Sequence, residues 1–387
     1  MLHAMVVHGE FPERAGFHTL TRQELSTLRS KWIALLGRRD TPTDGVEDYC
    51  VFLGRALADQ GVKLERVRVS WDERGWIGAL RQLRLACTAW RGKWVIVQYT
   101  ALMWSRRGLP IGAIVVAAML RRVGARVAVV FHEPCRQGGM RGIDRLRGAC
   151  QDWVIRKLYR QALKNIFTVP LETVSWLPKG EGKAAFISIG ANIPEQTNHR
   201  SPLGPDKKKT VIVFGVAEAP NGAREVDEIV GVVRKASEAL GKFRLVVVGR
   251  GCLEAQGQLE RGLEGQSVEL IVRGVLPAEE VASEFEQADV QLFVRGTINP
   301  RRGSALAGIA SGLPVVGYHN GDVTELLKDA GVEWSRWKDR DGLIRGLVRV
   351  LSDPRRWMEL HERNLQVQTH HLSWSRIAER FREVLGK

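Results

Sequence analysis

The chain has 387 residues, enough for two or three domains of about 100–200 residues each, and its 44% of hydrophobic residues excludes an intrinsically disordered protein. No segment approaches the ~20 apolar residues needed to span a bilayer, and the first residues lack the pattern of a signal peptide, so we expect a cytoplasmic protein. The formal net charge of +15 is concentrated in residues 1–200, which hold 31 Lys and Arg against 17 Asp and Glu, whereas the remainder holds 27 against 26. A surface of this sign attracts nucleic acid, anionic lipid headgroups or phosphorylated substrates.

Strand and helix patterns alternate through the first half of the chain. Residues 1–30 have no clear period and are predicted to be an N-terminal extension. From residue 31, KWIALLG predicts a strand, VEDYCVFLGRALADQG an amphipathic helix ending at Gly61, and VKLERVRV a second strand. The pattern continues with the strand KWVIVQY, the helix IGAIVVAAMLRRVG, the strand RVAVVFHEP, a basic helix over 145–164 and the strand NIFTV. This alternation predicts a parallel α/β sheet in a domain spanning 31–198.

A second α/β series follows a predicted linker. Residues 199–209 are polar, contain two prolines and end in a lysine run, which is a linker composition. The strands TVIVFG, FRLVVVGRG, VELIVRG and DVQLFV follow in a predicted domain spanning 210–368, with helices predicted over about 224–240 and around 279–287. From Asp353 the chain is predicted to be helical and amphipathic, with an interruption near HHLSWS. The fold class is therefore α/β, with two Rossmann-like lobes.

The stretch from Gly296 to Asp322 combines a loop with two arginines, a helix of small residues and a short apolar strand. Ser304 is the predicted N-cap of a helix over 305–311, Gly312 ends that helix, and the strand begins at Pro314. Because the helix has little side-chain bulk, a ligand could approach its backbone, and its N-terminus favours an anion. A tightly packed helix beside a basic surface loop explains the same residues, so both interpretations stay open at this point.

The five cysteines give no sign of a disulfide framework or a zinc site. They are scattered over the chain, without a CxxC pair and without the His/Cys spacing of metal ligands. We therefore expect neither.

Several motifs, in order, resemble GT-B glycosyltransferases, and among these the retaining family GT4 (glycosyl transferases group 1). In the second half, FRLVVVGRG, VRGVLPAEEVASEFEQADV and IASGLPVV are similar to successive motifs of that family, and the segment from Gly321 to Leu326 is similar to the motif that follows them. In the first half, DGVEDYCVFLGRALADQG resembles the glycine-containing first loop and helix, and VVFHEP the strand that ends in a histidine. The end of the chain, HLSWSRIAERFREVL, resembles the helix that crosses back to the first lobe, here predicted over 369–387.

The resemblance implies transfer of a sugar from a nucleotide-sugar donor, with retained anomeric configuration, with no cofactor and with no required metal. The first lobe would bind the acceptor and the second lobe the nucleotide. Gly45 matches the loop glycine that lies against the donor diphosphate, and a plain turn glycine is the alternative. His132 matches the family histidine that contacts the donor sugar, where it would donate a hydrogen bond or stabilise charge, and a purely structural histidine is the alternative. Glu133 is a weaker candidate for contact with the acceptor.

The second lobe departs from the family pattern in its charged residues. Asn299 and Ala307 stand where the family has two glutamates, and the expected arginine and lysine are replaced by Val216 and Asn221. The chain offers an RRGS element instead, found in some bacterial members, so we expect its residues to bind the donor diphosphate: Arg301, Arg302, Gly303 and Ser304. Arg250 is a lesser candidate for this role, and Asn299 and Glu325 are weak candidates for contact with the sugar.

The basic residues of the first lobe suggest contact with an anionic membrane surface. They are Arg121, Arg122, Arg136, Arg141, Arg145, Arg147, Arg156, Lys157 and Arg160, with Trp104 and Trp153 as candidate interfacial residues. A solvated basic surface is the alternative. Nucleic acid is the weaker partner, since no interleaved surface aromatics or reading motif accompany the charge.

The predicted function is therefore sugar transfer to a cell-envelope or exopolysaccharide acceptor, which we expect to be lipid-linked. Its rival is a degenerate GT-B protein that binds a nucleotide or a partner without turnover, which the missing charged residues motivate.

Overall fold

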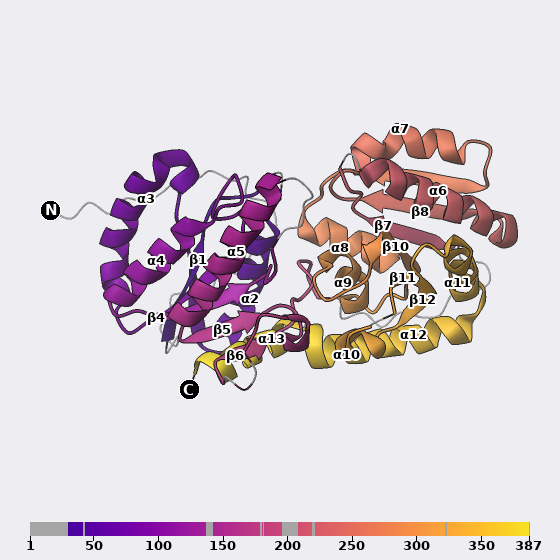
Figure 1. Cartoon of the computed structure of the whole chain (residues 1–387). Helices are drawn as coiled ribbons and strands as arrows, with labels where there is room; N and C mark the ends of the chain where they lie inside the picture. The colour runs from indigo at the N-terminus through magenta and orange to yellow at the C-terminus, as the bar shows by residue number, and fades with distance from the viewer. Residues whose placement is uncertain are drawn as a thin grey trace.

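The computed structural model of the protein describes residues 30–41, 43–136, 142–178, 180, 182–195, 208–218, 221–321 and 323–386. Two lobes lie side by side, each built on a parallel sheet (Figure 1). The predicted N-terminal extension, apart from Ser30, and most of the predicted linker lie outside the described residues. The exact domain boundaries therefore stay predictions.

The first lobe holds a parallel sheet with the strand order β2-β1-β3-β4-β5-β6. Its central strands are apolar runs buried along their whole length, as expected of a sheet covered on both faces. The strands are β1 (Ser30–Leu36), β2 (Val62–Arg68), β3 (Trp94–Tyr99), β4 (Arg126–Phe131), β5 (Lys164–Phe167) and β6 (Ala184–Phe186). The helices of this lobe are α2 (Gly45–Asp59), α3 (Trp71–Cys87), α4 (Ile111–Arg122) and α5 (Gly142–Gln161), with short 3-10 turns η1 (Thr88–Trp90) and η2 (Leu171–Thr173).

The second lobe repeats this plan with the strand order β12-β11-β10-β7-β8-β9. The strands are β7 (Thr210–Phe214), β8 (Phe243–Val248), β9 (Val268–Arg273), β10 (Val290–Thr297), β11 (Val315–His319) and β12 (Val332–Arg336). The helices are α6 (Asn221–Leu240), α7 (Cys252–Leu263), α8 (Ala278–Gln287), α9 (Gly303–Ala310), α10 (Glu325–Lys328) and α11 (Arg340–Ser352). Alternate residues of β7, β8 and β10 enter two separate apolar cores, one on each face of the sheet.

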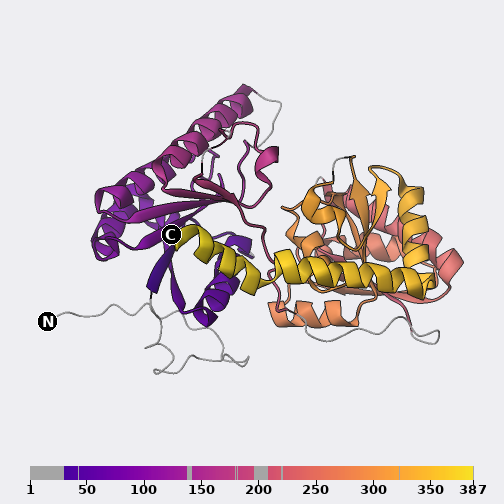
Figure 2. The same ribbon diagram turned by 90° about the horizontal axis from the view of Figure 1, so that it is seen from below.

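The end of the chain joins the two lobes. Helix α12 (Pro354–Val367) buries Trp357 and Leu360 in a core of the second lobe. A π-turn, η3 (Gln368–Leu372), then leads into α13 (Trp374–Leu385), whose apolar face belongs to the core of the first lobe. Figure 2 shows this segment, in yellow, running from one lobe to the other. The predicted C-terminal helix that crosses back to the first lobe is confirmed.

Trp374 is the residue that fastens the crossing helix. Its ring lies edge-on to Tyr49, 5.4 Å between centroids, and stacks on Phe52 at 5.6 Å. Its indole Nε1 donates to the backbone oxygen of Ala191 over 2.8 Å. A Cβ on Gly190 would come within 2.7 Å of the indole, so glycine is the residue that this contact allows.

Two sequence predictions about single residues are wrong. Ser304 is not an N-cap, because α9 begins at Gly303 and Arg302 occupies the cap position. Trp104 is fully buried, and its Nε1 donates to the backbone oxygen of Gln98, so it cannot reach a membrane interface. Trp153 is 53% exposed. Arg141 lies outside the described residues.

Within the described residues, no helix has the length and hydrophobicity that crossing a bilayer requires.

Replacing Trp374 by alanine should detach α13 from the first lobe. The indole is 5% exposed, and truncating a buried aromatic side chain costs about 3–5 kcal/mol of unfolding free energy. Urea unfolding followed by circular dichroism measures the loss. Trp153→Ala is the matched control and should change stability by less than about 0.5 kcal/mol; similar losses in both variants would contradict the proposed contact.

Candidate functional site

The candidate site lies where the carboxyl ends of the two sheets meet, since ligands of open α/β sheets bind beyond these ends. In the first lobe, β1 leads to the loop before α2, and β4 leads to His132. In the second lobe, the turns after β7 and β8 hold Gly215 and Arg250, and the end of β10 leads through Gly296 into the loop before α9. All but one of the residues predicted for the site lie in these turns or at the N-terminus of α9. The exception is Glu325, which begins α10, is 88% exposed at its side chain and pairs with Lys328.

Asp44 and Gly45 form the start of α2. Asp44 is the N-cap, and its carboxylate accepts from the backbone N–H groups of Val46 and Glu47 at 3.2 and 3.1 Å. Arg68 lies 3.4 Å from that carboxylate. Gly45 has ordinary φ, and a Cβ there would meet only the Asn192 amide, at 3.7 Å. Neither the backbone nor packing within the described chain therefore requires glycine, which leaves room for a ligand to approach.

His132 is held by two residues from neighbouring elements. Its Nε2 lies 2.8 Å from Gln98 Oε1, at the end of β3, and Tyr49 of α2 packs edge-on against the ring at 5.1 Å. Burial lowers the pKa of His132 to about 4, and the negative charge of Asp44 opposes this shift. At neutral pH the imidazole is therefore uncharged, with one nitrogen to donate and one to accept. With Gln98 Oε1 accepting from Nε2, Nδ1 is the acceptor.

Buried polar atoms without partners surround His132. Within the described part of the chain, the Tyr49 hydroxyl, Gln98 Nε2 and Glu133 Oε2 lack any hydrogen-bond partner. Buried polar groups are nearly always satisfied, because an unmet one costs its full desolvation. This surplus of donors and acceptors suits a ligand rich in hydroxyl groups.

The second lobe presents a set of tight glycine turns at the same edge. They have φ values that favour glycine: Gly215 at 77°, Gly249 at 110°, Gly251 at 75° and Gly296 at 86°. At Gly251 the packing is equally restrictive, since a Cβ would lie 2.2 Å from the backbone oxygen of Val216. These turns bring the backbone of three loops close together.

Arginines gather around these turns. A Cβ on Gly215 would lie 2.9 Å from an Arg295 guanidinium nitrogen, and one on Gly296 would lie 3.4 Å from Arg302. Burial lowers the pKa of Arg302, and the positive charges of Arg295 and Arg301 lower it further. Arg295 Nε lies 3.6 Å from the carboxylate of Glu225, which is 5% exposed. The cluster holds more positive charge than its one buried carboxylate balances, which favours an anion.

Arg295 is the functional candidate that the sequence reasoning missed. It lies in β10 (VQLFVRGT), where it reads as one polar residue at the end of an apolar strand. Gly215 and Gly296, which have positive φ in the structure, flank the cluster. These two glycines, at the ends of apolar strands in the sequence, are the signal that could have identified Arg295.

Arg250 reaches across from the second lobe to the first. Its guanidinium donates to the Thr43 backbone oxygen at 2.8 Å and to the Thr43 hydroxyl at 2.9 Å, and it lies 3.6 Å from Asp40. Thr43 is two positions before Gly45 in the sequence, so this contact places Arg250 of the second lobe near Gly45 of the first. Both residues were predicted to bind the donor diphosphate.

The small residues of α9 are explained mainly by packing. Ala305, Ala307 and Gly308 are buried, and a Cβ on Gly308 would lie 2.1 Å from Gln291 Oε1 of β10. Gln291 also donates to the backbone oxygen of Ser304 at 2.7 Å. The body of α9 is therefore closed to a ligand, whereas Gly303 and Ser304 at its start are half-buried and the preceding Arg301 and Arg302 are exposed.

The remaining predicted residues have local partners. Asn299 accepts from the Arg301 backbone N–H at 3.0 Å, which shapes the loop before α9.

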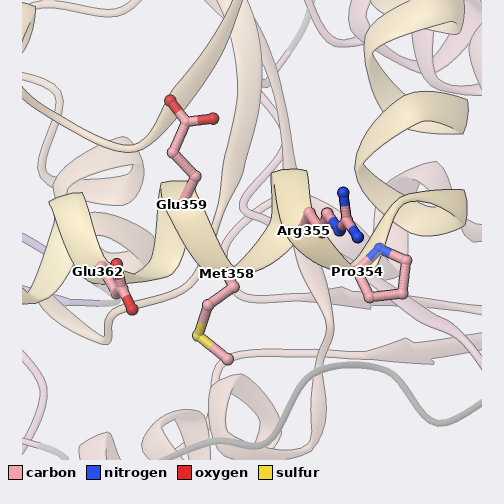
Figure 3. Close-up of a pocket in the computed structure, with 5 residues that line it drawn as sticks. All are labelled: Pro354, Arg355, Met358, Glu359 and Glu362. Carbon is pink, nitrogen blue, oxygen red and sulfur yellow. The ribbon is translucent and has the colours of Figure 1, made fainter.

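No group of His, Cys, Asp and Glu within the described ranges is arranged to hold a metal ion. A surface hollow on α12, drawn in Figure 3, is lined by residues outside the turns described above: Pro354, Arg355, Met358, Glu359 and Glu362.

Comparison with known proteins identifies the fold. No protein-family model matches the chain, and no curated protein sequence does. Among solved structures, sucrose-phosphate synthase of Thermosynechococcus elongatus has a TM-score of 0.66 at 16% identity, over 92% of this chain and 98% of its own. HepE of Anabaena, in complex with UDP and glucose, has a TM-score of 0.62 at 11% identity, over 92% and 99%. The chain has the GT-B fold.

The GT-B fold also occurs with other chemistry. A putative UDP-N-acetylglucosamine 2-epimerase from Listeria monocytogenes matches 91% of this chain and 94% of its own, with a TM-score of 0.57 and 12% identity. The reaction must therefore be argued from the residues of the site.

The low pKa of His132 should make it a source of acid destabilisation. Between pH 6.5 and about 4 the unfolded chain binds a proton at this residue and the folded chain does not, so stability falls as the pH falls. His132→Gln should remove this contribution, which is worth roughly 3 kcal/mol at most. Urea unfolding at pH 7 and at pH 4.5 tests it, with His370→Gln, at an exposed position, as control; unchanged pH dependence in His132→Gln would rule out a buried neutral imidazole.

Proposed function

We propose that the protein is a retaining glycosyltransferase that moves a sugar from a nucleoside-diphosphate donor to a cell-envelope or exopolysaccharide acceptor, which is lipid-linked. The observation that carries the proposal is the arginine cluster at the glycine turns of the second lobe, facing the contact between Arg250 and the loop before α2. A diphosphate is the anion that suits several guanidinium groups gathered beside glycine turns.

The comparisons support a nucleotide ligand. HepE of Anabaena was crystallised with UDP and with UDP-glucose, and Staphylococcus aureus MnaA with UDP. Each matches this chain on the same fold, with TM-scores of 0.57 to 0.60. The donor that we propose belongs to this class.

In the proposed reaction the acceptor hydroxyl approaches the anomeric carbon from the side on which the diphosphate leaves. The bond between that carbon and the diphosphate oxygen breaks, the bond to the acceptor oxygen forms, and the leaving oxygen takes the acceptor proton. Arg301, Arg302 and Arg295 stabilise the negative charge that develops on the diphosphate. Neutral His132 forms a hydrogen bond to the sugar. No protein nucleophile and no metal is part of this proposal.

The proposed acceptor and cellular location rest on charge. The first half of the chain carries nearly all of its net positive charge, which suits an enzyme that works at the cytoplasmic face of an anionic membrane on a lipid-linked acceptor.

A degenerate GT-B protein that binds without turnover is the second candidate. Ala307 stands where a ribose-binding carboxylate is expected and is 1% exposed inside the packed part of α9. Val216, in place of an arginine, is also buried. Binding without turnover would then follow from the loss of these contacts.

Turnover separates the two candidates. The purified protein, incubated with UDP-glucose or GDP-mannose and a membrane extract, should release nucleoside diphosphate and label lipid, with or without EDTA. Nuclear magnetic resonance of the product should show the anomeric configuration of the donor. Binding of nucleotide without release would favour the degenerate protein, and the absence of binding at millimolar concentration would reject both.

The arginines before α9 should carry donor affinity. Arg301→Ala with Arg302→Ala is expected to raise the Kd for UDP by about 100-fold, because each hydrogen bond to a charged group is worth about 1.5–3 kcal/mol. Arg302→Ala alone should account for most of this, since the Arg302 guanidinium lies against Gly296. Titration calorimetry measures both. Arg121→Ala with Arg122→Ala is the control at the end of α4, and an equal loss there would refute the assignment.

A further inference from the structure

Helices α3, α4 and α5 form one outer face of the first lobe. They pack side by side over the same face of the sheet, and α2 and α13 cover the opposite face (Figures 1 and 2). The outward residues of α3, α4 and α5 are called the α3–α5 face below.

Large apolar side chains are exposed on this face to an unusual degree. Ten of the twelve large apolar residues that the described chain leaves exposed belong to the first lobe, and seven of these lie on the three helices. The seven are Ile77 and Leu85 of α3, Ile111 and Val115 of α4, and Ile143, Leu146 and Trp153 of α5. Soluble proteins rarely gather so many, and such patches mark interaction surfaces.

The exposed residues follow helical spacing, so each helix presents a stripe. Ile77, Arg81 and Leu85 are four residues apart on α3, and Arg84 lies beside them. On α5, Leu146 and Trp153 are seven residues apart, and the stripe continues at Arg160. Apolar and basic side chains therefore alternate along the same outward lines.

Most basic side chains of the face form no ion pair with a described residue, and Arg147, which pairs with Asp144, is an exception. Within the described part of the chain, none of the following forms a salt bridge: Arg74, Arg81, Arg84, Arg121, Arg122, Arg145, Lys157 and Arg160. In the second lobe, by contrast, Arg340 pairs with Asp227 and Glu228, and Arg356 pairs with Glu333 and Glu359. The charges of the α3–α5 face are left available to an external anion.

We propose that the α3–α5 face binds the surface of an anionic lipid bilayer, with Leu85, Leu146 and Trp153 entering the headgroup region and the arginines binding lipid phosphates. Amphipathic helices that combine basic side chains with leucine and tryptophan bind membrane surfaces in this way. Two faces of this charge would repel each other, so a second copy of the chain is not the partner. Nucleic acid is the weaker fit, since it is bound through stacked aromatics and Trp153 is the one aromatic side chain among the seven.

The face continues to the mouth of the candidate site. Leu102 and Leu109, in the loop between β3 and α4, are 42% and 39% exposed. That loop leaves β3 at the sheet edge where His132 follows β4. If the proposed function holds, a lipid-linked acceptor in the bound membrane would lie on the side of the cleft that holds His132.

The test uses sedimentation with vesicles of phosphatidylcholine alone and of equal parts phosphatidylcholine and phosphatidylglycerol, without donor or acceptor. The full chain should bind the anionic vesicles and release them as salt rises. Because no substrate is present, failure here leaves the transferase proposal unaffected, and an inactive enzyme can still bind vesicles.

Matched variants distinguish insertion from charge. Leu85→Ser with Leu146→Ser should weaken vesicle binding by at least about tenfold without reducing its salt dependence. Arg81→Gln with Arg160→Gln should weaken binding and reduce that salt dependence. Leu253→Ser with Arg261→Gln, exposed on α7 of the second lobe, should bind as the wild type does. Thermal unfolding confirms that each variant is folded.

A spectroscopic readout tests Trp153 directly. Brominated phosphatidylcholine in the anionic vesicles should quench wild-type fluorescence more than that of Trp153→Phe. Absence of vesicle binding, or wild-type binding by the leucine variant, would overturn the proposal. Binding of duplex DNA that competes with vesicles and depends on the arginines but not on the leucines would assign the face to nucleic acid instead.

Discussion

The position of Trp374 is the constraint on which the rest of the structure depends. Its indole is fixed against Gly190 and Ala191 at the end of the first lobe, while α12, from which it continues, is anchored in the second. Tyr49 touches both Trp374 and His132, so the residue that joins the lobes is two contacts away from the candidate site. A sheet edge alone would place His132, and the crossing helix together with the Arg250–Thr43 contact fixes the second lobe against the first.

The arginine cluster is a costly arrangement in the absence of a ligand. Like charges on Arg295, Arg301 and Arg302 disfavour one another, as the lowered pKa of Arg302 reflects, and the buried carboxylate of Glu225 offsets only part of this. The surrounding glycines have positive φ and no side chains, so the guanidinium groups of Arg295 and Arg302 lie directly against the glycine backbone. Such preorganised charge is most useful where a multiply charged anion binds and negative charge increases during reaction.

The sequence predicted the buried strands well, because parallel strands covered on both faces are continuous apolar runs, such as WVIVQY in β3. It missed α3, whose helical period is broken at Gly75 with φ 69°, and α7, whose apolar face is narrow. It left open whether α9 was packed or exposed, because the deciding contact, Gln291 against Gly308, joins residues 17 positions apart in sequence. Local spacing identified the elements, and the side-chain contacts between elements required the structure.

The electrostatic effect of each arginine outside the protein depends on whether a carboxylate pairs with it. In the second lobe, surface arginines such as Arg340 and Arg356 are bound to neighbouring carboxylates and contribute little field outside the protein. On α3–α5 several arginines, such as Arg81 and Arg84, form no salt bridge with a described residue and lie beside exposed leucines, where they attract anions and the leucines favour an apolar layer. At the candidate site Arg295 and Arg302 lie beside glycines. The same side chain thus suits the proposed lipid surface among exposed leucines and the proposed diphosphate beside glycine turns, and its neighbours make the difference.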